Sequence, residues 1–510
     1  MSKRKKARDY LRTDSGNAEM LAAFYGSIVR FDHKQQRWLI WGKGPKCWTE
    51  DTEGLVIRLL KRATRKRMQG AVAAPECEER AKEIKWTLDS ESRYRIDAAL
   101  ALAKAEPPIS DSGEGWDSDL WLFGVSNGIV DLRAGKLREP TQKDRVTKFS
   151  PVVFDPTVEC PRWLQFLAEV FGSDAELIRF MQKAVGYTLS GSVEEHCFFA
   201  LYGTGRNGKT TFLEVMLFVM GNYGVDIPFC NLETKHYPIG EGVSLPGARF
   251  AKSVETRRGQ QLDEGRIKSW TGGDTITVRP LHRNAFSFQP THKLWLAFNH
   301  KPEIQDASPA MWSRVHLIPF SQRFEKGQAD KRLLGVLRNE ASGILNWALE
   351  GCLAWQREGL EAPAAVERAT DEYEQESDTL APFLADRCVT DPQYSAPTGE
   401  LWQAYQRYCD ETATPMMYQK EFSDRLDEKG FRRDRVGHHR QRVRTGLRLR
   451  QGDADTRTGA DATLPLNPKD EPNREKTENS RPQASARPQG RSLEELVRGL
   501  EPPVFVPWDS

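Results

Sequence analysis

Apolar residues recur along this chain with two different periods, and the periods divide it into helical and extended segments. Spacings of three and four residues, which place apolar side chains on one side of a helix, predict helices at about 18–28, 52–68, 78–105, 163–171, 175–189, 329–357, 398–410 and 419–429. Short apolar runs between turn residues predict strands at 29–31, 37–41, 197–202, 249–254, 275–279, 285–288, 293–298 and 315–320. A further strand-rich piece spans 120–137, and strand–turn–strand is expected over 431–449.

The composition narrows the class of protein but does not indicate what the protein binds. The 510 residues are 38% hydrophobic and 29% charged, with a net charge of +2, so charge has to be assessed segment by segment. The eight cysteines form no C-x-x-C pair, which argues against a zinc site and a disulfide framework. No run of 18 apolar residues occurs, so no membrane span is expected, and no membrane is counted among the partners. We expect a soluble, cytoplasmic protein of a bacterium or a phage-infected host.

A phosphate-binding loop is the clearest chemical signal. Residues 203–210 follow an apolar run, precede a helical pattern, and read G-x-x-x-x-G-K-T. The backbone N–H groups and the helix N-terminus of such a loop surround phosphate oxygens, and its lysine and threonine serve the β- and γ-phosphates and Mg²⁺. The alternative is a glycine-rich turn that opens an ordinary helix. The predicted ATP-binding residues are Gly203, Thr204, Gly205, Arg206, Asn207, Gly208, Lys209, Thr210 and Thr211.

Other polar residues follow the later strands of the same region. Glu255 comes directly after the strand 249–254, and Asn299 comes directly after the strand 293–298. An acid there can orient water and help to hold Mg²⁺, and an amide can contact a γ-phosphate or the attacking water. Arg314 precedes the last strand and is a candidate arginine finger. Each of these residues is also compatible with an ordinary surface position.

A predicted β-hairpin carries the candidate contacts to single-stranded DNA. Strands at 275–279 and 285–288 flank a polar tip, and the cationic residues around it are Arg279, His282 and Arg283. Lys268 lies just before, in the segment that ends with Thr-Gly-Gly-Asp at 271–274. Cationic side chains give a sequence-independent, salt-sensitive hold on a phosphate backbone. Plain surface charge is the alternative for each residue.

The order of these motifs resembles the superfamily 3 helicases, and within them the helicase part of the phage/plasmid and poxvirus-type primase-helicases. The resemblance covers about residues 13–450 and rests on G-x-x-x-x-G-K-T, Glu255-Thr256, Thr-Gly-Gly-Asp, Asn-His-Lys-Pro at 299–302 and Trp-Ser-Arg at 312–314. It implies an AAA+-like P-loop core, ATP and Mg²⁺ as ligands, and a homo-hexameric ring. It also implies that the hairpin lines a central pore.

The resemblance assigns roles to individual residues. It makes Lys209 and Thr210 the Walker A pair, Glu255 the Walker B acid, Asn299 the sensor, and Arg314 a residue that acts on a neighbouring subunit's ATP. Catalysis is thus expected of Lys209, Glu255, Asn299 and Arg314, and Mg²⁺ binding of Thr210 and Glu255. Two departures from the family pattern concern this set. Val254 stands where many members have a second acid, and Ser313 stands where a second arginine is common.

The C-terminal third predicts a winged-helix DNA-binding module. Two helices and a strand–turn–strand segment follow an acidic connector at 367–378. The expected wing is rich in arginine and contains a single acid, Asp434. This density is the electrostatic footprint of nucleic-acid binding, with a solvated hairpin as the alternative. The candidate contacts are Arg435, Arg440, Arg442 and Arg444, with Arg432, Arg433, Arg448 and Arg450 nearby.

These predictions give a domain plan. A basic tail at 1–12 precedes an α+β domain at 13–150, whose tryptophans Trp38, Trp41 and Trp48 are either core aromatics or base-stacking platforms. A helical linker at 151–192, an ATPase domain at 193–360 and a winged helix at 375–450 follow. The polar segment 451–510 is expected to be disordered. Its end is either a docking peptide for a replication protein or unstructured.

The favoured function is an ATP-driven ring helicase for replication of a phage, plasmid or other mobile element, acting on single- and double-stranded DNA. One alternative is a DNA-dependent ATPase that loads or remodels other replication proteins. Another is a winged-helix regulator that does not hydrolyse ATP. We expect no primase activity, because the sequence contains neither an acidic metal-binding cluster nor a zinc-ligand pattern.

Overall fold

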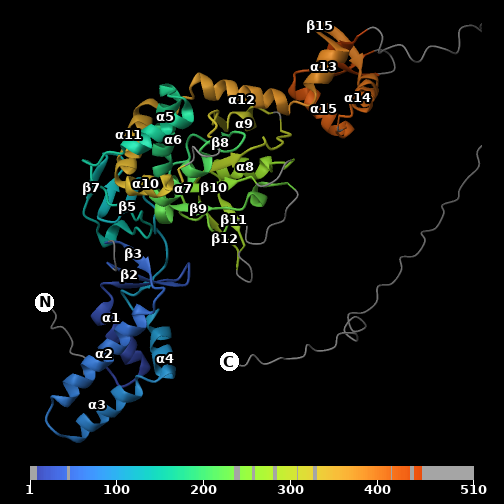
Figure 1. Ribbon diagram of the computed structural model, residues 1–510. Helices are drawn as coiled ribbons and strands as arrows, with labels where there is room; N and C mark the ends of the chain where they lie inside the picture. Colours follow the sequence, from blue (N-terminus) through green and yellow to red (C-terminus); the bar gives the residue numbers. More distant parts are fainter. Residues whose placement is uncertain are drawn as a thin grey trace, which may run out of the picture. The chain divides into compact units, whose positions relative to one another are not determined.

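The computed structural model describes residues 9–42, 46–234, 242–255, 259–279, 284–306, 308–325, 330–414, 416–436 and 441–450 (Figure 1). Four groups of predictions lie outside these residues. They concern the start of the basic tail, His282 and Arg283 at the hairpin tip, Arg440 in the wing, and the segment 451–510.

The N-terminal part combines helices with a small sheet of order β3-β2-β1-β4. Its elements are α1 (Asp14–Tyr25), β1 (Val29–Asp32), β2 (Arg37–Trp41), β3 (Trp48–Glu50), α2 (Leu55–Val72), α3 (Glu78–Asp89), α4 (Arg93–Ala103) and β4 (Ser110–Asp111). The single helix predicted over 78–105 is wrong, because Ser90 donates from its hydroxyl to the carbonyl of Trp86 (2.8 Å) and a turn separates α3 from α4.

One tryptophan of this part is a core residue. Trp48 is 1% exposed and packs against the rings of Trp41 and Trp116, with ring centroids 5.5 and 5.6 Å apart. Trp38 and Trp41 are half-buried, and Trp38 packs edge-on against Phe31. The core interpretation is therefore confirmed for Trp48.

A second antiparallel sheet and two helices lead into the central domain. The elements are β5 (Leu122–Val125), β6 (Gly128–Asp131), β7 (Lys136–Arg138), α5 (Pro161–Phe171) and α6 (Ala175–Leu189). Helix α6 begins at the N-cap Asp174, whose side chain accepts from the N–H of Leu177. The predicted helices at 163–171 and 175–189 are confirmed.

A five-stranded parallel sheet of order β14-β8-β13-β10-β9 forms the central domain. Its elements are β8 (Phe198–Tyr202), α7 (Lys209–Met220), β9 (Gly224–Asp226), β10 (Phe250–Val254), α8 (Glu264–Thr271), β11 (Ile276–Val278), β12 (Phe286–Phe288), β13 (Lys293–Phe298), α9 (Pro309–Trp312), β14 (Val315–Pro319), α10 (Leu333–Asn339) and α11 (Ala341–Glu358). The helix predicted over 329–357 is two helices, because the chain turns at Glu340 between α10 and α11.

Both faces of the parallel sheet are covered. Along β8, Phe199 and Leu201 enter the core that α5, α6, α7 and α11 share, whereas Phe198 and Ala200 enter the core on the other face. The side chains of a strand alternate between the two faces, and burial on both faces explains why β8 is apolar along its length.

The segment predicted as an acidic connector is the helix α12 (Ala364–Ser377). Val366 and Tyr373 are buried at helical spacing, and α12 packs on β14. The acidic residues between them occupy the remaining surface of the helix. The segment was named only as an acidic connector from its sequence, and its helical structure was not predicted.

The C-terminal module contains a three-stranded sheet of order β15-β17-β16 and three helices. Its elements are α13 (Ala381–Arg387), β15 (Cys388–Pro397), α14 (Thr398–Thr412), α15 (Gln419–Glu428), β16 (Arg433–Val436) and β17 (Gln441–Leu449). Strand β15 was not predicted. A separate core of buried residues, including Phe383, Leu401, Tyr405 and Phe422, holds the module together.

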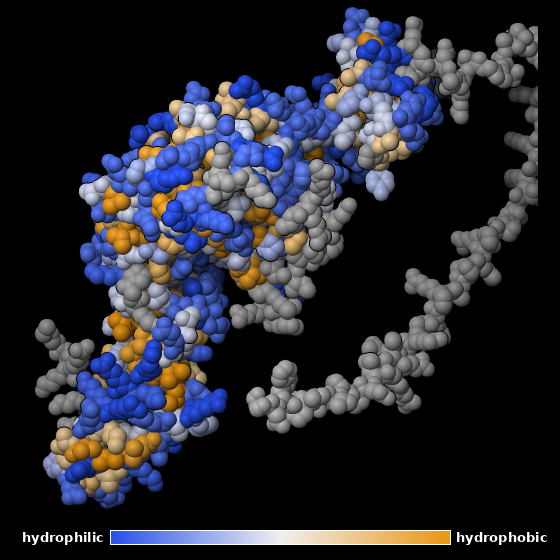
Figure 2. Space-filling view, in the orientation of Figure 1, coloured by the Kyte–Doolittle hydropathy of each residue, from blue (hydrophilic) through white to orange (hydrophobic). Residues whose placement is uncertain are grey.

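Hydrophilic residues cover most of the face visible in Figure 2. Within the part of the chain that the structure describes, every helix is too short or too polar to cross a membrane.

Candidate nucleotide site and nucleic-acid interface

The loop between β8 and α7 has the backbone that phosphate binding requires. Gly205, Arg206 and Gly208 have positive φ angles of 100°, 54° and 86°. At Gly208 a Cβ atom would also lie 2.6 Å from a methyl group of Val170, so only glycine fits there. Thr210 is exposed at the start of α7, where the N-terminus of the helix favours an anion.

Lys209 lies buried beneath this loop. Its Nζ donates to the carbonyl of Gly203 (2.6 Å), to Oδ1 of Asn207 (2.9 Å) and to Oδ1 of Asn299 (3.1 Å). Asn207 is itself fixed, because its Nδ2 donates to the carbonyl of Phe320 (3.1 Å). Burial lowers the pKa of Lys209 to about 8, although the nearby Glu255 opposes the shift.

Strand pairing brings the predicted residues to one edge of the sheet. Phe298 of β13 pairs with Tyr202 of β8, so Asn299 and the phosphate loop leave the sheet at the same level. The backbone N–H of Glu255 donates to the carbonyl of Ala297 (2.8 Å), which places the end of β10 beside them. The carboxyl edge of a parallel sheet is the usual place for a ligand site.

Glu255 is held with one oxygen occupied. Its Oε2 accepts from the backbone N–H groups of Asn299 and His300, each at 3.1 Å, while Oε1 is buried and has no hydrogen-bond partner among the residues that the structure describes. Burial raises the pKa of this carboxyl group. A buried oxygen that lacks a donor, close to a buried ammonium group, fits a site for a water molecule or a hydrated cation.

The residues at this edge fit a nucleoside triphosphate with Mg²⁺. Lys209 and the loop N–H groups would hold phosphate oxygens, and Thr210 and Glu255 are the groups available to the metal ion or its water. Mg²⁺ in such a site neutralises charge that develops on the β- and γ-phosphates. The chain itself supplies the fixed Lys209 and the carboxylate of Glu255. Because the pKa of Glu255 is raised, its carboxylate is a better proton acceptor than an ordinary glutamate.

Arg314 lies away from this edge. Val315, the next residue, pairs with Phe198 at the start of β8, and Phe198 N–H donates to the carbonyl of Arg314 (2.8 Å). The five residues of β8 therefore separate Arg314 from the phosphate loop, roughly 16 Å at the usual rise of a strand. The Arg314 guanidinium donates to the carbonyl of Ala310, and its buried Nε has no partner within the described part of the chain.

The predicted hairpin is present as β11 and β12, with Ile276 opposite Phe288 and Val278 opposite Phe286. Arg279 is exposed next to β11. Lys268 forms an ion pair with Asp306 and also donates to the hydroxyl of Ser308 (3.3 Å), so its charge is already engaged within the protein.

The C-terminal arginines differ in their surroundings. Arg435 and Arg442 are exposed, as predicted for DNA contacts. Arg444 is fully buried and donates to Asp427, to the carbonyl of Phe431 (2.9 Å) and to Ser423. The prediction that Arg444 contacts DNA was wrong, because it holds strand β17 against helix α15.

Sequence reasoning placed Lys301 in the Asn-His-Lys-Pro motif but gave it no role of its own, and the structure shows that it links the site to α12. Its Nζ forms a 2.7 Å ion pair with Glu376 and lies over the rings of Tyr202 and Tyr373, 5.2 and 5.4 Å from their centroids. The hydroxyl of Tyr373 donates to the carbonyl of Pro302. Two of the three groups that contact Lys301, namely Glu376 and Tyr373, lie on α12, where no helix was predicted.

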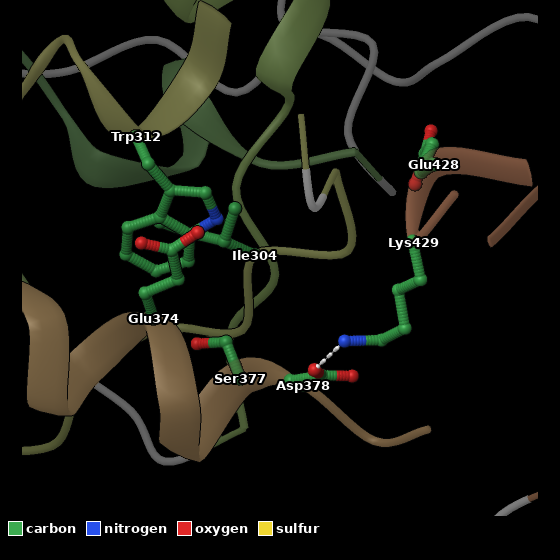
Figure 3. Close-up of a pocket in the computed structure, with 7 residues that line it drawn as sticks. All are labelled: Ile304, Trp312, Glu374, Ser377, Asp378, Glu428 and Lys429. Atoms are coloured by element: carbon green, nitrogen blue, oxygen red, sulfur yellow. Dashed lines mark hydrogen bonds and ion pairs between the residues drawn. The ribbon is translucent and has the colours of Figure 1, made fainter. Parts of the chain in front are cut away.

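A small pocket lies between α9, α12 and α15, beside Ile304 in the segment that follows β13 (Figure 3). Lys429 and Asp378 form an ion pair at its rim. None of its lining residues belongs to the phosphate loop, so the pocket is not part of the nucleotide site. The lining residues are Ile304, Trp312, Glu374, Ser377, Asp378, Glu428 and Lys429.

Two family models match this chain. The model described as "D5 N terminal like" matches residues 18–172, and a family of unknown function, DUF5906, matches residues 201–314. The second match contains the phosphate loop, Glu255, Asn299 and Arg314.

Relatives occur in large DNA viruses. A protein of Acanthamoeba polyphaga mimivirus named a "putative helicase" is 26% identical over 297 residues, which cover 54% of this chain and 31% of that protein. A "putative helicase" of Frog virus 3 is 24% identical over 379 residues (58% and 39%), and a "putative primase" of African swine fever virus is 21% identical over 306 residues (54% and 32%). The chain thus spans about a third of the length of these relatives.

A solved structure, the apo C-terminal region of NrS-1, aligns over 82% of this chain and 87% of that chain, with 11% identity and a TM-score of 0.44.

Together the sequence matches relate the chain to proteins of large DNA viruses that are named putative helicases and putative primases. The resemblance to the primase-helicases, predicted from the order of the motifs, is confirmed, and membership of superfamily 3 is consistent with these relatives.

Proposed function

We propose that this chain is an ATP-dependent superfamily 3 DNA helicase that works as a homo-hexameric ring in replication of a phage, plasmid, virus or other mobile element. One observation carries the proposal. Lys209 is fixed by Gly203, Asn207 and Asn299, and Glu255 is bound to the backbone of the same Asn299. A phosphate-binding lysine, an acid and an amide sensor thus share one network.

The network gives each residue a task in ATP hydrolysis. Lys209 would exchange its three protein acceptors for phosphate oxygens when ATP binds. Asn299 would then be released to contact the γ-phosphate or the attacking water, and Glu255 would orient that water and accept its proton. Because Glu255 accepts from two backbone N–H groups, its carboxylate keeps its position during this exchange.

The position of Arg314 supports a shared active site. Arg314 is at the amino edge of the sheet and its own phosphate loop is at the carboxyl edge, so it does not reach the ATP of its own subunit without a large movement. In a ring, the amino edge of one subunit would face the site of the next. A shared site makes hydrolysis depend on assembly and couples neighbouring subunits.

DNA contact is assigned to two places. The β11–β12 hairpin, with Arg279 beside it, would grip a single strand in the pore. The C-terminal module has the helix–strand–helix–helix–strand–strand order of a winged helix and exposes arginines on its last two strands. Lys268 is a weaker candidate, since Asp306 already neutralises it.

The test is unwinding of a forked duplex with ATP and Mg²⁺, with Lys209→Ala as the matched inactive protein. Strand separation by the unaltered protein, absent for Lys209→Ala, is the expected result. DNA-stimulated ATP hydrolysis without strand separation would favour a loader or remodeller of replication proteins instead. ATP hydrolysis equal in both proteins would overturn the assigned site, and DNA binding without any hydrolysis would favour a regulator.

Primer synthesis is not part of the proposal, although some relatives are named primases. Incorporation of ribonucleotides by the purified chain on a single-stranded template would contradict this.

A further inference from the structure

The two last strands of the C-terminal module, β16 and β17, carry a row of arginines on one side. Arg433 and Arg435 are two residues apart on β16, and Arg442 and Arg444 are two residues apart on β17. In the antiparallel register Arg433 lies opposite Arg444, and Arg435 lies opposite Arg442. Residues two apart on a strand, and residues directly opposite, share a face of the sheet. We call these two strands the β16–β17 ribbon.

The inner pair of this row is neutralised by helix α15. Arg444 is buried and bound to Asp427, and Arg433 forms ion pairs with Asp424 (2.8 Å) and Asp427. The two carboxylates of the helix therefore account for both inner guanidinium groups, which serve the packing of the module.

The outer pair has no such compensation. Arg435 and Arg442 are exposed, and neither guanidinium has an acid partner among the residues that the structure describes. Like charges directly opposite on neighbouring strands destabilise a sheet. The repulsion is relieved when a polyanion lies across the pair, so the outer half of the ribbon has the character of a binding surface and the inner half does not.

Helix α15, by contrast, is poorly suited to DNA. It carries the acids Glu421, Asp424, Asp427 and Glu428. Its one arginine, Arg425, is buried and donates to the carbonyl of Gln305 in the central domain (2.8 Å) and to Thr379 (3.1 Å). A helix with this charge, whose arginine is already engaged, would be repelled by phosphates in a groove of DNA.

We propose that the C-terminal module binds the phosphate backbone of duplex DNA through Arg435 and Arg442, and that helix α15 does not read bases. This deepens the proposed function and rests on its assignment of the module to DNA. Backbone contact without base contact positions a protein on DNA but carries no sequence preference. A duplex fits better than a single strand, because binding of single strands uses exposed aromatic rings, and the only aromatic residue in 431–436 and 441–450 is Phe431, which packs against the module's core.

The test compares variants of the full chain for binding to a fluorescently labelled 30-base-pair duplex by anisotropy, without nucleotide, over a range of salt concentrations. Loss of two phosphate contacts in R435A/R442A is expected to weaken binding by about tenfold or more and to reduce the salt slope by about 1.8. R433A is the matched control on the same ribbon, since the charge of Arg433 is engaged by the helix. K420A, which removes the exposed lysine of α15, is the control on that helix. Both controls should bind as the unaltered protein does, and R435K/R442K should retain most of the affinity.

Four outcomes would overturn the proposal: unchanged affinity and salt slope in R435A/R442A, loss of binding in K420A, strong preference for one duplex sequence, or tighter binding of single-stranded DNA or RNA through these two arginines. Circular dichroism of each variant excludes unfolding as the cause. ATP hydrolysis without DNA is measured in parallel. ATP hydrolysis without DNA depends on the Lys209 site alone. A result that contradicts the proposed ATPase can therefore be distinguished from one that contradicts DNA binding by Arg435 and Arg442.

Discussion

Lys209 and Asn299 are joined by a 3.1 Å hydrogen bond from Nζ to Oδ1, across the ends of the neighbouring parallel strands β8 and β13. The bond links the group that would hold the phosphates to the group that would sense them. It also leaves Lys209 with protein acceptors in a buried position, where its ammonium charge is less stable than in water.

ATP binding should weaken at alkaline pH. Burial lowers the pKa of Lys209 to about 8, and a polyphosphate beside it would raise this pKa in the complex. A group whose pKa rises on binding takes up a proton, so affinity is greatest below pH 8 and falls as the pH rises through that value. The KM for ATP should increase above about pH 8. Calorimetry at pH 8.5 in two buffers of different ionisation enthalpy should detect the proton uptake.

The Lys209→Arg variant is the control for this pH dependence. Arginine stays charged throughout the range, so any binding that remains should lose the dependence near pH 8. The same alkaline rise in KM in this variant would assign the dependence to another group.

Asn299→Ala should slow hydrolysis much more than it weakens ATP binding. The amide is placed to contact groups whose charge changes during the reaction, and the loss of one such contact lowers kcat by on the order of 10²-fold. Steady-state kinetics would separate kcat from KM. A variant with unchanged kcat and a raised KM would assign Asn299 to ground-state binding alone.

Arg314→Ala and Lys209→Ala should each be inactive, and their equimolar mixture should regain activity. If Arg314 acts on the next subunit, random mixing leaves about one interface in four with both groups intact. Hydrolysis in the mixture should then approach about a quarter of the unaltered rate, provided the subunits exchange. A mixture with no activity, after exchange has been verified with labelled subunits, would contradict action in trans.

Arg249→Ala should destabilise the chain without a direct effect on the nucleotide site. Arg249 is buried, lies over the ring of Tyr223, and donates to the carbonyls of Leu189 and Leu122. Removal leaves two buried carbonyl groups without a donor, a cost on the order of 3 kcal/mol. Thermal unfolding should show a Tm lower by several degrees. Arg179→Ala, which removes an exposed ion pair with Glu358, is the matched control and should change Tm little.

The sequence predicted the edge of the sheet better than the surfaces around it. Residues that follow buried parallel strands must meet at one edge, so the proximity of Lys209, Glu255 and Asn299 followed from strand order alone. Nothing in the local sequence distinguished Arg444 from Arg442, because the difference depends on which of them faces Asp427 across the module. The burial of a charged side chain is a tertiary property.

Helix α12 shows a different kind of failure. Val366 and Tyr373 have the spacing of a buried helical stripe, but the segment was named only as an acidic connector and no helix was predicted there. The charge composition of the segment was weighed more heavily than its period. The period was the better guide, since one apolar stripe is enough to hold a helix on a sheet.

The buried cations at the amino edge of the sheet bear on where this protein can be divided. Arg249 binds the carbonyls of Leu122 and Leu189, and Lys293 binds those of Ser190 and Ser192 (3.0 Å). All four acceptors precede residue 193, where an ATPase fragment would naturally be cut. Such a fragment would keep two interior charges and lose the groups that solvate them. Backbone carbonyl groups before the ATPase domain therefore take the place of water around the buried cations of its sheet. A functional fragment has to begin before Leu122.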